Sequence, residues 1–178
     1  ASDRMGSMDI FVVDREGGIP KRLTTHSGNE TPVAFKDADH ILFLANVMPS
    51  AEDAQFPSGQ FQQVYEVSTT GDRPVMFSSM PMEDISINKT GNALLYHDKK
   101  GYEDLWRKHH TSSITRDIWL CSLDGKRSYR KLTSFNGEDR TPVWASDGKS
   151  FYYLSEEKGS FNVFKRALDG TSSTQLTH

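Results

Sequence analysis

The chain has 178 residues, a formal net charge of -3 and a pI of about 6.1, with 25% charged and 11% aromatic residues. The length predicts one domain, or at most a domain and a fragment. No basic stretch marks a nucleic-acid surface. No apolar run approaches the ~18 residues that a membrane helix needs. Composition therefore excludes a nucleic-acid-binding or membrane-spanning protein and leaves a hydrophilic globular chain.

The N-terminal residues lack the charged-then-apolar pattern of a signal peptide, and the chain holds a single cysteine. Cys121 therefore has no partner for a disulfide within the chain. Its setting, "DIWLCSLDG", indicates a small core residue of a strand, and the alternative is a reactive thiol.

Two kinds of passage alternate along the chain. The first kind has an alternating apolar and aromatic run, a turn signal and, in three of its four copies, a Leu-Thr pair. It occurs at Met8–Thr25, Gln62–Ser79, Arg116–Ser134 and Phe161–His178. The second kind occurs at Glu30–Ala45, Glu83–Asp98 and Arg140–Ser155. Equivalent positions recur about every 45 to 55 residues, which indicates a repeat protein.

Each passage predicts a β-hairpin. It holds two short runs rich in Val, Ile, Phe, Tyr and Trp, separated by a turn signal. Asp124-Gly125, Asp147-Gly148 and Asp169-Gly170 are dipeptides that tolerate positive φ, and Asp147-Gly148 is expected in a tight two-residue turn. Only Glu103–His110 is a candidate helix, of about two turns.

Two hairpins make a four-stranded unit, and such units repeated without helices are typical of β-propeller blades. The sequence predicts an all-β partial β-propeller of about three and a half four-stranded blades. We expect a half blade at 1–29 and complete blades at 30–82, 83–139 and 140–178. The first residues, Ala1–Val13, align with Leu154–Arg166 and predict the end of a second blade strand. An open ring exposes apolar blade faces, so we expect self-association or completion by further blades.

The repeats resemble those of TolB-type and tricorn-type propellers. The resemblance rests on "DIFVVDREGGIPKRLT", "DIWLCSLDGKRSYRKLT" and "TPVWASDGKSFYYLS", and it covers nearly the whole chain. The passage around Ile85 departs from the pattern, because it lacks the proline and the aromatic residue. Gly101–Leu120 resembles the propeller of tricorn-like serine proteases more than that of TolB.

The resemblance to tricorn-like proteases implies a parent protein in which a PDZ domain and a catalytic core follow the propeller. The propeller of that family is a non-catalytic gate, so this chain would be a scaffold and a peptide-access filter. One alternative is a TolB-like protein-interaction propeller without an attached enzyme. Another is a hydrolase or lyase with its site in the central channel. Relatives occur inside and outside the cytoplasm, and export is slightly favoured here.

Two connections, 46–60 and 99–115, are longer than the others and are expected on one face of the propeller. The second gathers aromatic and cationic residues, namely Tyr102, Trp106, Arg107, Lys108, His109 and His110. Such residues suit the binding of a peptide, a carboxylate or a protein partner. The alternative is that Trp106 and Tyr102 pack against the blade edge while the charged residues are solvated.

The sequence predicts no catalytic residue, metal site or cofactor. It has no G-x-S-x-G turn, and Ser78-Ser79 and Ser112-Ser113 are ordinary strand-end and loop serines. Adjacent His109 and His110 point to opposite sides of an extended segment, and no Cys or third His lies nearby in the sequence. No phosphate-binding loop occurs.

Carboxylates recur where the second kind of passage begins, at Glu30, Glu83-Asp84 and Glu138-Asp139. Recurrence at one position of a repeat predicts a structural role, in which these side chains hold backbone N–H groups. The alternative is a paired-carboxylate glycosidase or lyase site.

Overall fold

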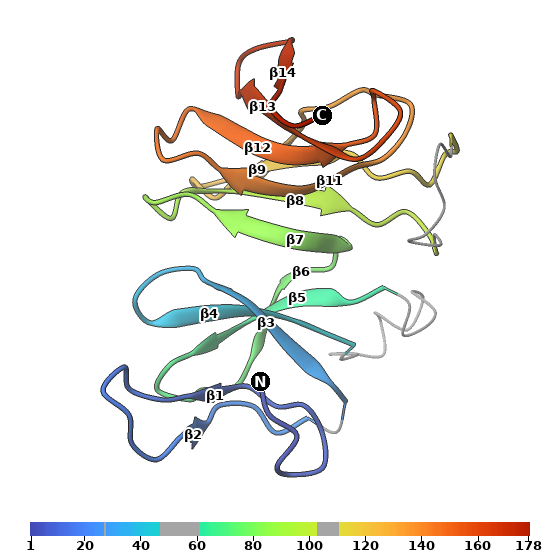
Figure 1. The fold of residues 1–178 in the computed structure, drawn as a ribbon. Helices are drawn as coiled ribbons and strands as arrows, with labels where there is room; N and C mark the ends of the chain where they lie inside the picture. Colours follow the sequence, from blue (N-terminus) through green and yellow to red (C-terminus); the bar gives the residue numbers. More distant parts are fainter. Residues whose placement is uncertain (27, 47–60, 103–110) are drawn as a thin grey trace. The chain divides into compact units, whose positions relative to one another are not determined.

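The computed structural model describes residues 1–26, 28–46, 61–102 and 111–178, in which every regular element is a β-strand (Figure 1). The expected all-β class is therefore confirmed. The chain divides into two compact units, Ala1–Pro81 and Met82–His178. Among the described residues no helix is long and apolar enough to cross a bilayer.

The first unit holds a two-stranded sheet and a four-stranded sheet, both antiparallel. The two-stranded sheet pairs β1 (Phe11–Val12) with β2 (Lys21–Arg22). The four-stranded sheet is a meander of β3 (Glu30–Phe35), β4 (His40–Ala45), β5 (Gln63–Ser68) and β6 (Val75–Ser78). Its core joins Ile10 and Leu23 of the small sheet region to Phe43 and Tyr65 of the large sheet.

The second unit holds two four-stranded antiparallel meanders. One contains β7 (Met82–Ile87), β8 (Ala93–Asp98), β9 (Ile118–Ser122) and β10 (Ser128–Lys131). The other contains β11 (Asp139–Trp144), β12 (Ser150–Ser155), β13 (Asn162–Ala167) and β14 (Ser173–Gln175). The first strand of the second sheet, β11, packs against β7 and β8 of the first. The core between the sheets includes Leu95, Ile118, Phe151 and Phe164.

The expected match between Ala1–Val13 and Leu154–Arg166 is seen in their backbone pairing. Ser2 and Asp9 form an antiparallel bridge, as Ser155 and Asn162 do between β12 and β13. A glycine with positive φ follows each first partner, Gly6 at 102° and Gly159 at 95°. The same local sequence therefore produces the same turn in both places.

A threonine of each Leu-Thr pair extends the outer hairpin beyond its last ladder bond. The Thr24 hydroxyl accepts the N–H of Ile10 at 2.9 Å, Thr133 accepts that of Ile118 at 3.0 Å, and Thr177 accepts that of Val163 at 2.9 Å. In each repeat the preceding leucine N–H donates to the carbonyl of the same partner residue at 2.8 Å. The threonine hydroxyl thus replaces a backbone carbonyl where the last strand leaves the sheet.

Asp147-Gly148 does not form the expected two-residue turn. β11 ends at Trp144 and β12 begins at Ser150, so five residues connect the strands. Asp147 accepts hydrogen bonds from the N–H groups of Lys149 and Ser150 and from the Ser150 hydroxyl. Gly148 has the expected positive φ of 64°. The turn is longer because the Asp147 side chain satisfies backbone groups that a tight turn would pair directly.

Cys121 is fully buried in β9, as the sequence predicted. Burial raises the pKa of its thiol, which disfavours the reactive thiolate.

Replacing Thr133 with Val should destabilise the chain by about 1–3 kcal/mol, because the buried N–H of Ile118 would lose its acceptor. The free energy of unfolding in urea measures the effect. Ser134→Ala is the matched control, since Ser134 is exposed, and its effect should stay within about 0.5 kcal/mol. Equal losses in the two variants would contradict the role given to the threonine hydroxyl.

Candidate functional site

The binding residues expected from the sequence fall mostly outside the described residues. Tyr102 is described and its side chain is exposed. Trp106, Arg107, Lys108, His109 and His110 lie in 103–110, outside the described residues, as does the candidate helix at Glu103–His110. Most of the other long connection, 47–60, is also outside them. The structure therefore leaves this binding surface a prediction.

A different cluster of polar residues lies where β7 and β11 begin in the second unit. Both strands carry a bulge, between Glu83 and Ser86 in β7 and between Arg140 and Val143 in β11. Asp84 and Thr141 occupy equivalent positions in these bulges, with φ of 49° and 52°. The Thr141 hydroxyl donates to the Asp84 carboxylate at 2.7 Å, so the two bulges are bonded to each other.

Thr141 is the more unusual of the two residues. Asp tolerates left-handed backbone, whereas a β-branched residue rarely adopts it. Such strain persists only where the surroundings impose it, and it often marks a functional site. The surroundings here include the ring of His97, whose Nδ1 accepts the N–H of Thr141 at 3.2 Å.

His97 connects the two bulges from β8, where it is buried. Because Nδ1 accepts a backbone N–H, the ring proton lies on Nε2, which is 3.2 Å from Glu83 Oε2. Both ring nitrogens are therefore occupied by protein groups. In this arrangement His97 has no free nitrogen with which to act as a general base, and it orients Glu83 and Thr141 instead.

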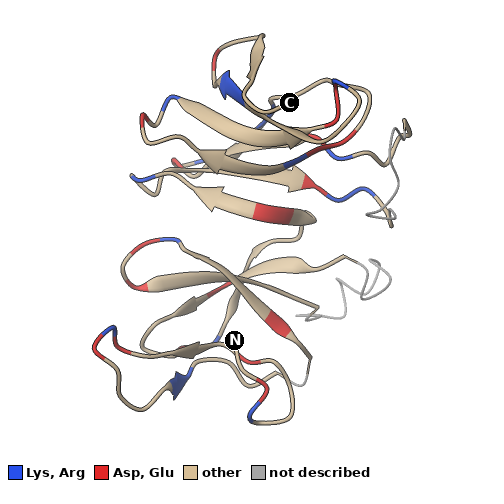
Figure 2. Cartoon of the chain, in the orientation of Figure 1, with Lys and Arg blue, Asp and Glu red and all other residues tan. Residues whose placement is uncertain are grey.

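Cations surround the Glu83 carboxylate. Lys99 Nζ lies 2.7 Å from Oε1, and Arg116 Nε lies 3.5 Å from Oε2. The hydrogen bond from His97, together with the hydrogen bond and charge of Lys99, lowers the pKa of Glu83 to about 2 despite its partial burial. Figure 2 shows acidic positions at one end of β7 and basic positions directly after β8.

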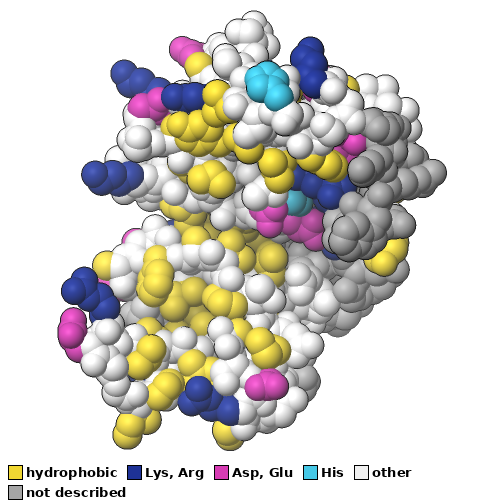
Figure 3. Space-filling view, in the orientation of Figure 1, with side chains coloured by type: hydrophobic (Ala, Val, Ile, Leu, Met, Phe, Trp, Pro, Cys, Tyr) yellow, Lys and Arg dark blue, Asp and Glu magenta, His cyan; other side chains and the backbone are white. Residues whose placement is uncertain are grey.

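A second buried carboxylate continues the cluster. Glu138 is only 1% exposed, and its two oxygens pair with Arg116 at 3.4 Å and with Arg140 at 2.9 Å. The backbone N–H of Arg116 also donates a hydrogen bond to Glu138 Oε2 at 3.4 Å. Arg140 stacks over the ring of Phe161 at 5.0 Å. In the space-filling view acidic, basic and histidine side chains adjoin one another in this unit (Figure 3).

This charge-paired cluster, defined by Glu83, Asp84, His97, Arg116, Glu138, Arg140 and Thr141, presents its Asp84 carboxylate to solvent with a side chain 49% exposed. The hydrogen bond from the Thr141 hydroxyl connects that carboxylate, which lies on β7, to the neighbouring sheet. Such a surface suits hydrogen bonding or charge pairing with a ligand that approaches the first strands of the sheets.

The sequence indicated part of this cluster. The recurrence of carboxylates at Glu83-Asp84 and Glu138-Asp139 predicts that these side chains hold backbone N–H groups, and Glu138 does accept one. His97, Arg116 and Arg140 were missed as partners. The only sequence signal for them was their place at strand ends next to the repeated carboxylates, and their pairing depends on how the two sheets pack.

Comparison with solved structures defines the class of protein. TolB from Acinetobacter baumannii superposes with a TM-score of 0.62 and 18% identity, over 94% of this chain and 37% of its own. A puromycin-hydrolyzing peptidase of Mycobacterium tuberculosis superposes with a TM-score of 0.66 and 15% sequence identity. The match covers 96% of this chain and 27% of the peptidase chain. The tricorn protease superposes with a TM-score of 0.51 and 13% sequence identity, and the match covers 94% of this chain and 20% of the protease chain. These likenesses show the fold alone, which is a partial β-propeller.

The family follows from the sequence match. The model of the tricorn protease N-terminal beta propeller domain matches residues 1–178, so the chain belongs to that family. The expected tricorn-like and TolB-like resemblance is therefore confirmed. No curated protein shows a significant match. The chain spans about a third of the length of the Acinetobacter TolB structure.

Replacing Glu83 with Gln should remove a charge that stabilises the folded state. Its pKa of about 2 lies below the 4.5 of an unperturbed glutamate, so the stabilisation is complete above pH 4.5 and is lost as the pH falls through 2. We expect a loss of about 1–2 kcal/mol at pH 7, measured by urea unfolding, which shrinks steadily between pH 4.5 and pH 2. Glu16→Gln, at an exposed position, is the control. A loss that is independent of pH would contradict this role.

Proposed function

We propose that this chain is a non-catalytic β-propeller portion of a tricorn-like serine protease, in which it serves as a scaffold and as a filter for peptide access. The family assignment over the whole chain supports the propeller and its tricorn type. The attached protease and the filter role are the proposed part. The M. tuberculosis peptidase, which superposes over 27% of its own chain, provides a precedent for a propeller of this fold within a peptidase.

The single observation that carries the filter role is the exposed Asp84 carboxylate in the charge-paired cluster. β7 and β11 are the first strands of their sheets, and β11 packs against β7 and β8. In a propeller the sheets surround a central channel, and closely approaching first strands are expected to border it. A carboxylate held there favours cationic peptides over anionic ones by charge complementarity.

We further propose that the segment with Tyr102, Trp106, Arg107, Lys108, His109 and His110 contributes to binding a peptide or protein. Tyr102 is exposed, as a binding residue would need to be. The remaining support is compositional, since aromatic and cationic side chains together are common in binding surfaces.

A TolB-like protein-interaction propeller without an attached enzyme is the second candidate. The TM-score of 0.62 to the Acinetobacter TolB structure, against 0.51 to the tricorn protease, favours it. The two candidates differ in whether the full-length protein cleaves peptides.

Asp84→Asn tests the filter in the full-length protein that carries this segment. Asn accepts left-handed backbone and keeps the hydrogen bond from Thr141, so the change removes charge and little else. We expect cleavage of long cationic peptides to fall about two- to fivefold relative to neutral ones, with unchanged turnover of a short chromogenic substrate. Asp124→Asn, at an exposed turn, is the control.

An unchanged ratio of cationic to neutral cleavage in Asp84→Asn would overturn the filter role. A full-length protein that cleaves no peptide would support the TolB-like alternative. Cleavage by the isolated 178-residue chain would instead support a propeller hydrolase.

The triple substitution of Trp106, Arg107 and His109 with Ala tests the proposed binding segment. We expect the melting temperature to change little, because loop substitutions usually cost less than about 0.5 kcal/mol. Binding of a fluorescein-labelled peptide library, followed by anisotropy, should weaken. A sharp drop in melting temperature would instead show that these residues are packing elements.

A further inference from the structure

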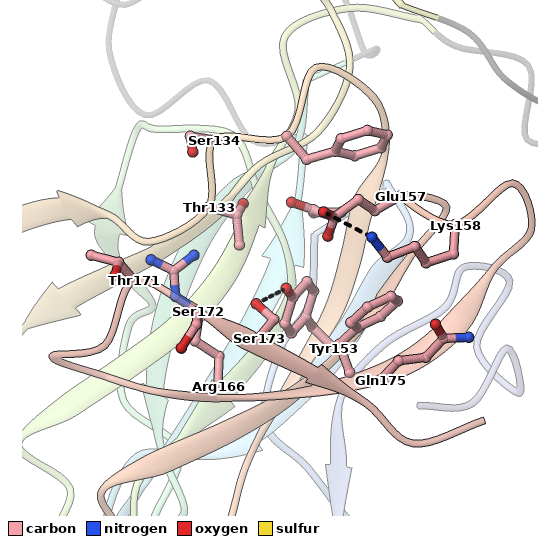
Figure 4. Close-up of a pocket in the computed structure, with 13 residues that line it drawn as sticks. Thr133, Ser134, Tyr153, Glu157, Lys158, Arg166, Thr171, Ser172, Ser173 and Gln175 are labelled. Carbon is pink, nitrogen blue, oxygen red and sulfur yellow. Dashed lines mark hydrogen bonds and ion pairs between the residues drawn. The ribbon is translucent and has the colours of Figure 1, made fainter. Parts of the chain in front are cut away.

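A cavity of about 480 Å³ lies within the second unit, and none of the residues that define the charge-paired cluster lines it (Figure 4). Its volume falls within the range of about 300–1,000 Å³ that is usual for small-molecule sites. It lies between the segment that leads into β11 and the strands β12, β13 and β14. Its walls combine aromatic rings with charged and hydroxyl groups. These groups include Asp139, Tyr153, Lys158, Arg166 and Ser173.

The first unit has a cavity at the equivalent place in its own repeat. Glu30 stands there at the start of β3, as Asp139 does at the start of β11. The ring pair Phe43 and Tyr65, with centroids 5.7 Å apart, corresponds to Tyr153 and Phe164 at 5.8 Å. The recurrence shows that this fold leaves a cavity at the position, and that side chains decide its chemistry.

The two cavities differ in polarity. The wall contributed by the last strand is apolar in the first unit, with Val75 and Met76, and polar in the second, with Ser173 and Gln175. The Tyr153 hydroxyl has no counterpart in Phe43, and it lies 2.7 Å from the Ser173 hydroxyl. Figure 4 shows these two hydroxyl groups facing each other inside the cavity. The last strand therefore gives the second cavity a polar wall that the first lacks, although the first also contains the charged residues Glu30 and Arg73.

The two carboxylates also differ in how they are satisfied. Glu30 accepts a hydrogen bond from the Thr24 hydroxyl. Asp139 is one methylene shorter and 1% exposed, and neither of its oxygens has an aligned hydrogen-bond donor. Burial raises the pKa of Asp139 to about 6, although the nearby Ser155 and Thr133 hydroxyls oppose the rise. A buried carboxylate without a donor is costly, and a ligand donor would relieve that cost.

A positive group also lines the cavity. Arg166 reaches the cavity from β13, and its Nε donates to the carbonyl of Gly170 at 3.0 Å, which orients the guanidinium group. Burial raises the pKa of Tyr153, and the charges of Asp139 and Arg166 act on it in opposite directions. One wall of the cavity thus offers a carboxylate and another offers a guanidinium.

We propose that this cavity binds a small zwitterion of the amino acid or dipeptide class. The ligand's ammonium group donates to Asp139, and its carboxylate pairs with Arg166. Lys158 and Glu157 also line the cavity and pair with each other at 3.8 Å. That pair is exposed, with side chains 58% and 41% accessible, so its opening to admit a ligand costs little. The proposal does not depend on whether a protease is attached.

Titration calorimetry of the chain with L-alanyl-L-alanine tests the proposal. We expect saturable binding that weakens about tenfold or more when the probe is N-acetylated, and again when its carboxylate is amidated. Asp139→Asn should reproduce the first loss, and Arg166→Gln should reproduce the second.

Matched controls separate the site from general effects. Glu30→Gln changes the equivalent carboxylate of the other cavity and should leave binding unchanged. Lys165→Gln removes a neighbouring charge that pairs with Asp147, and successive strand residues point to opposite faces, so it should also have no effect. If Asp139→Asn fails to fold, the N-acetylated probe still tests recognition of the ammonium group, and Arg166→Gln still tests recognition of the carboxylate.

No binding of the dipeptide would overturn the proposal. Equal binding of the dipeptide and its N-acetylated form would do the same, because Asp139 would then have no part in recognition. These outcomes are independent of the filter test, which concerns Asp84 and long peptides.

Discussion

A hydrogen bond from a backbone N–H to a threonine hydroxyl closes the outer hairpin wherever the Leu-Thr pair occurs. A four-stranded sheet ends at its last strand, where the chain must leave the ladder and begin the next repeat. The hydroxyls of Thr24, Thr133 and Thr177 take the N–H that this departure would otherwise leave buried without an acceptor. The exit is therefore made in the same way in the three copies that carry the Leu-Thr pair.

Buried carboxylates lie at the starts of the first strands, shortly after these exits. Glu30 accepts from its threonine and is satisfied by it. Glu138 pairs with Arg116 and Arg140, and Asp139 has no aligned donor. Neighbouring positions at the start of the first strand thus provide a structural contact, a charge-paired cluster and a cavity wall. A difference of one methylene group or one neighbouring cation decides among these results, because buried carboxylates are costly unless they are paired.

Much of the fold could be predicted from the sequence because its signals are local. Alternating apolar residues specify strands, and Leu-Thr and glycine positions recur with the repeat, so the hairpins were recognisable. The alignment of the first residues with Leu154–Arg166 is matched by the Ser2–Asp9 bridge. At Asp147-Gly148 the sequence predicted a shorter turn than the one observed. Residue type alone does not show how many backbone groups a side chain will satisfy.

By itself, the sequence determined the class of fold, the order of its hairpins and the recurrence of carboxylates, all of which depend on residues close together in the chain. Only the tertiary structure decided which of those residues meet. Thr141 contacts Asp84, which lies 57 positions away in the sequence. The contact is made between two bulges, and their backbone angles cannot be read from the composition. Such contacts depend on the twist and packing of whole sheets, to which many distant residues contribute together.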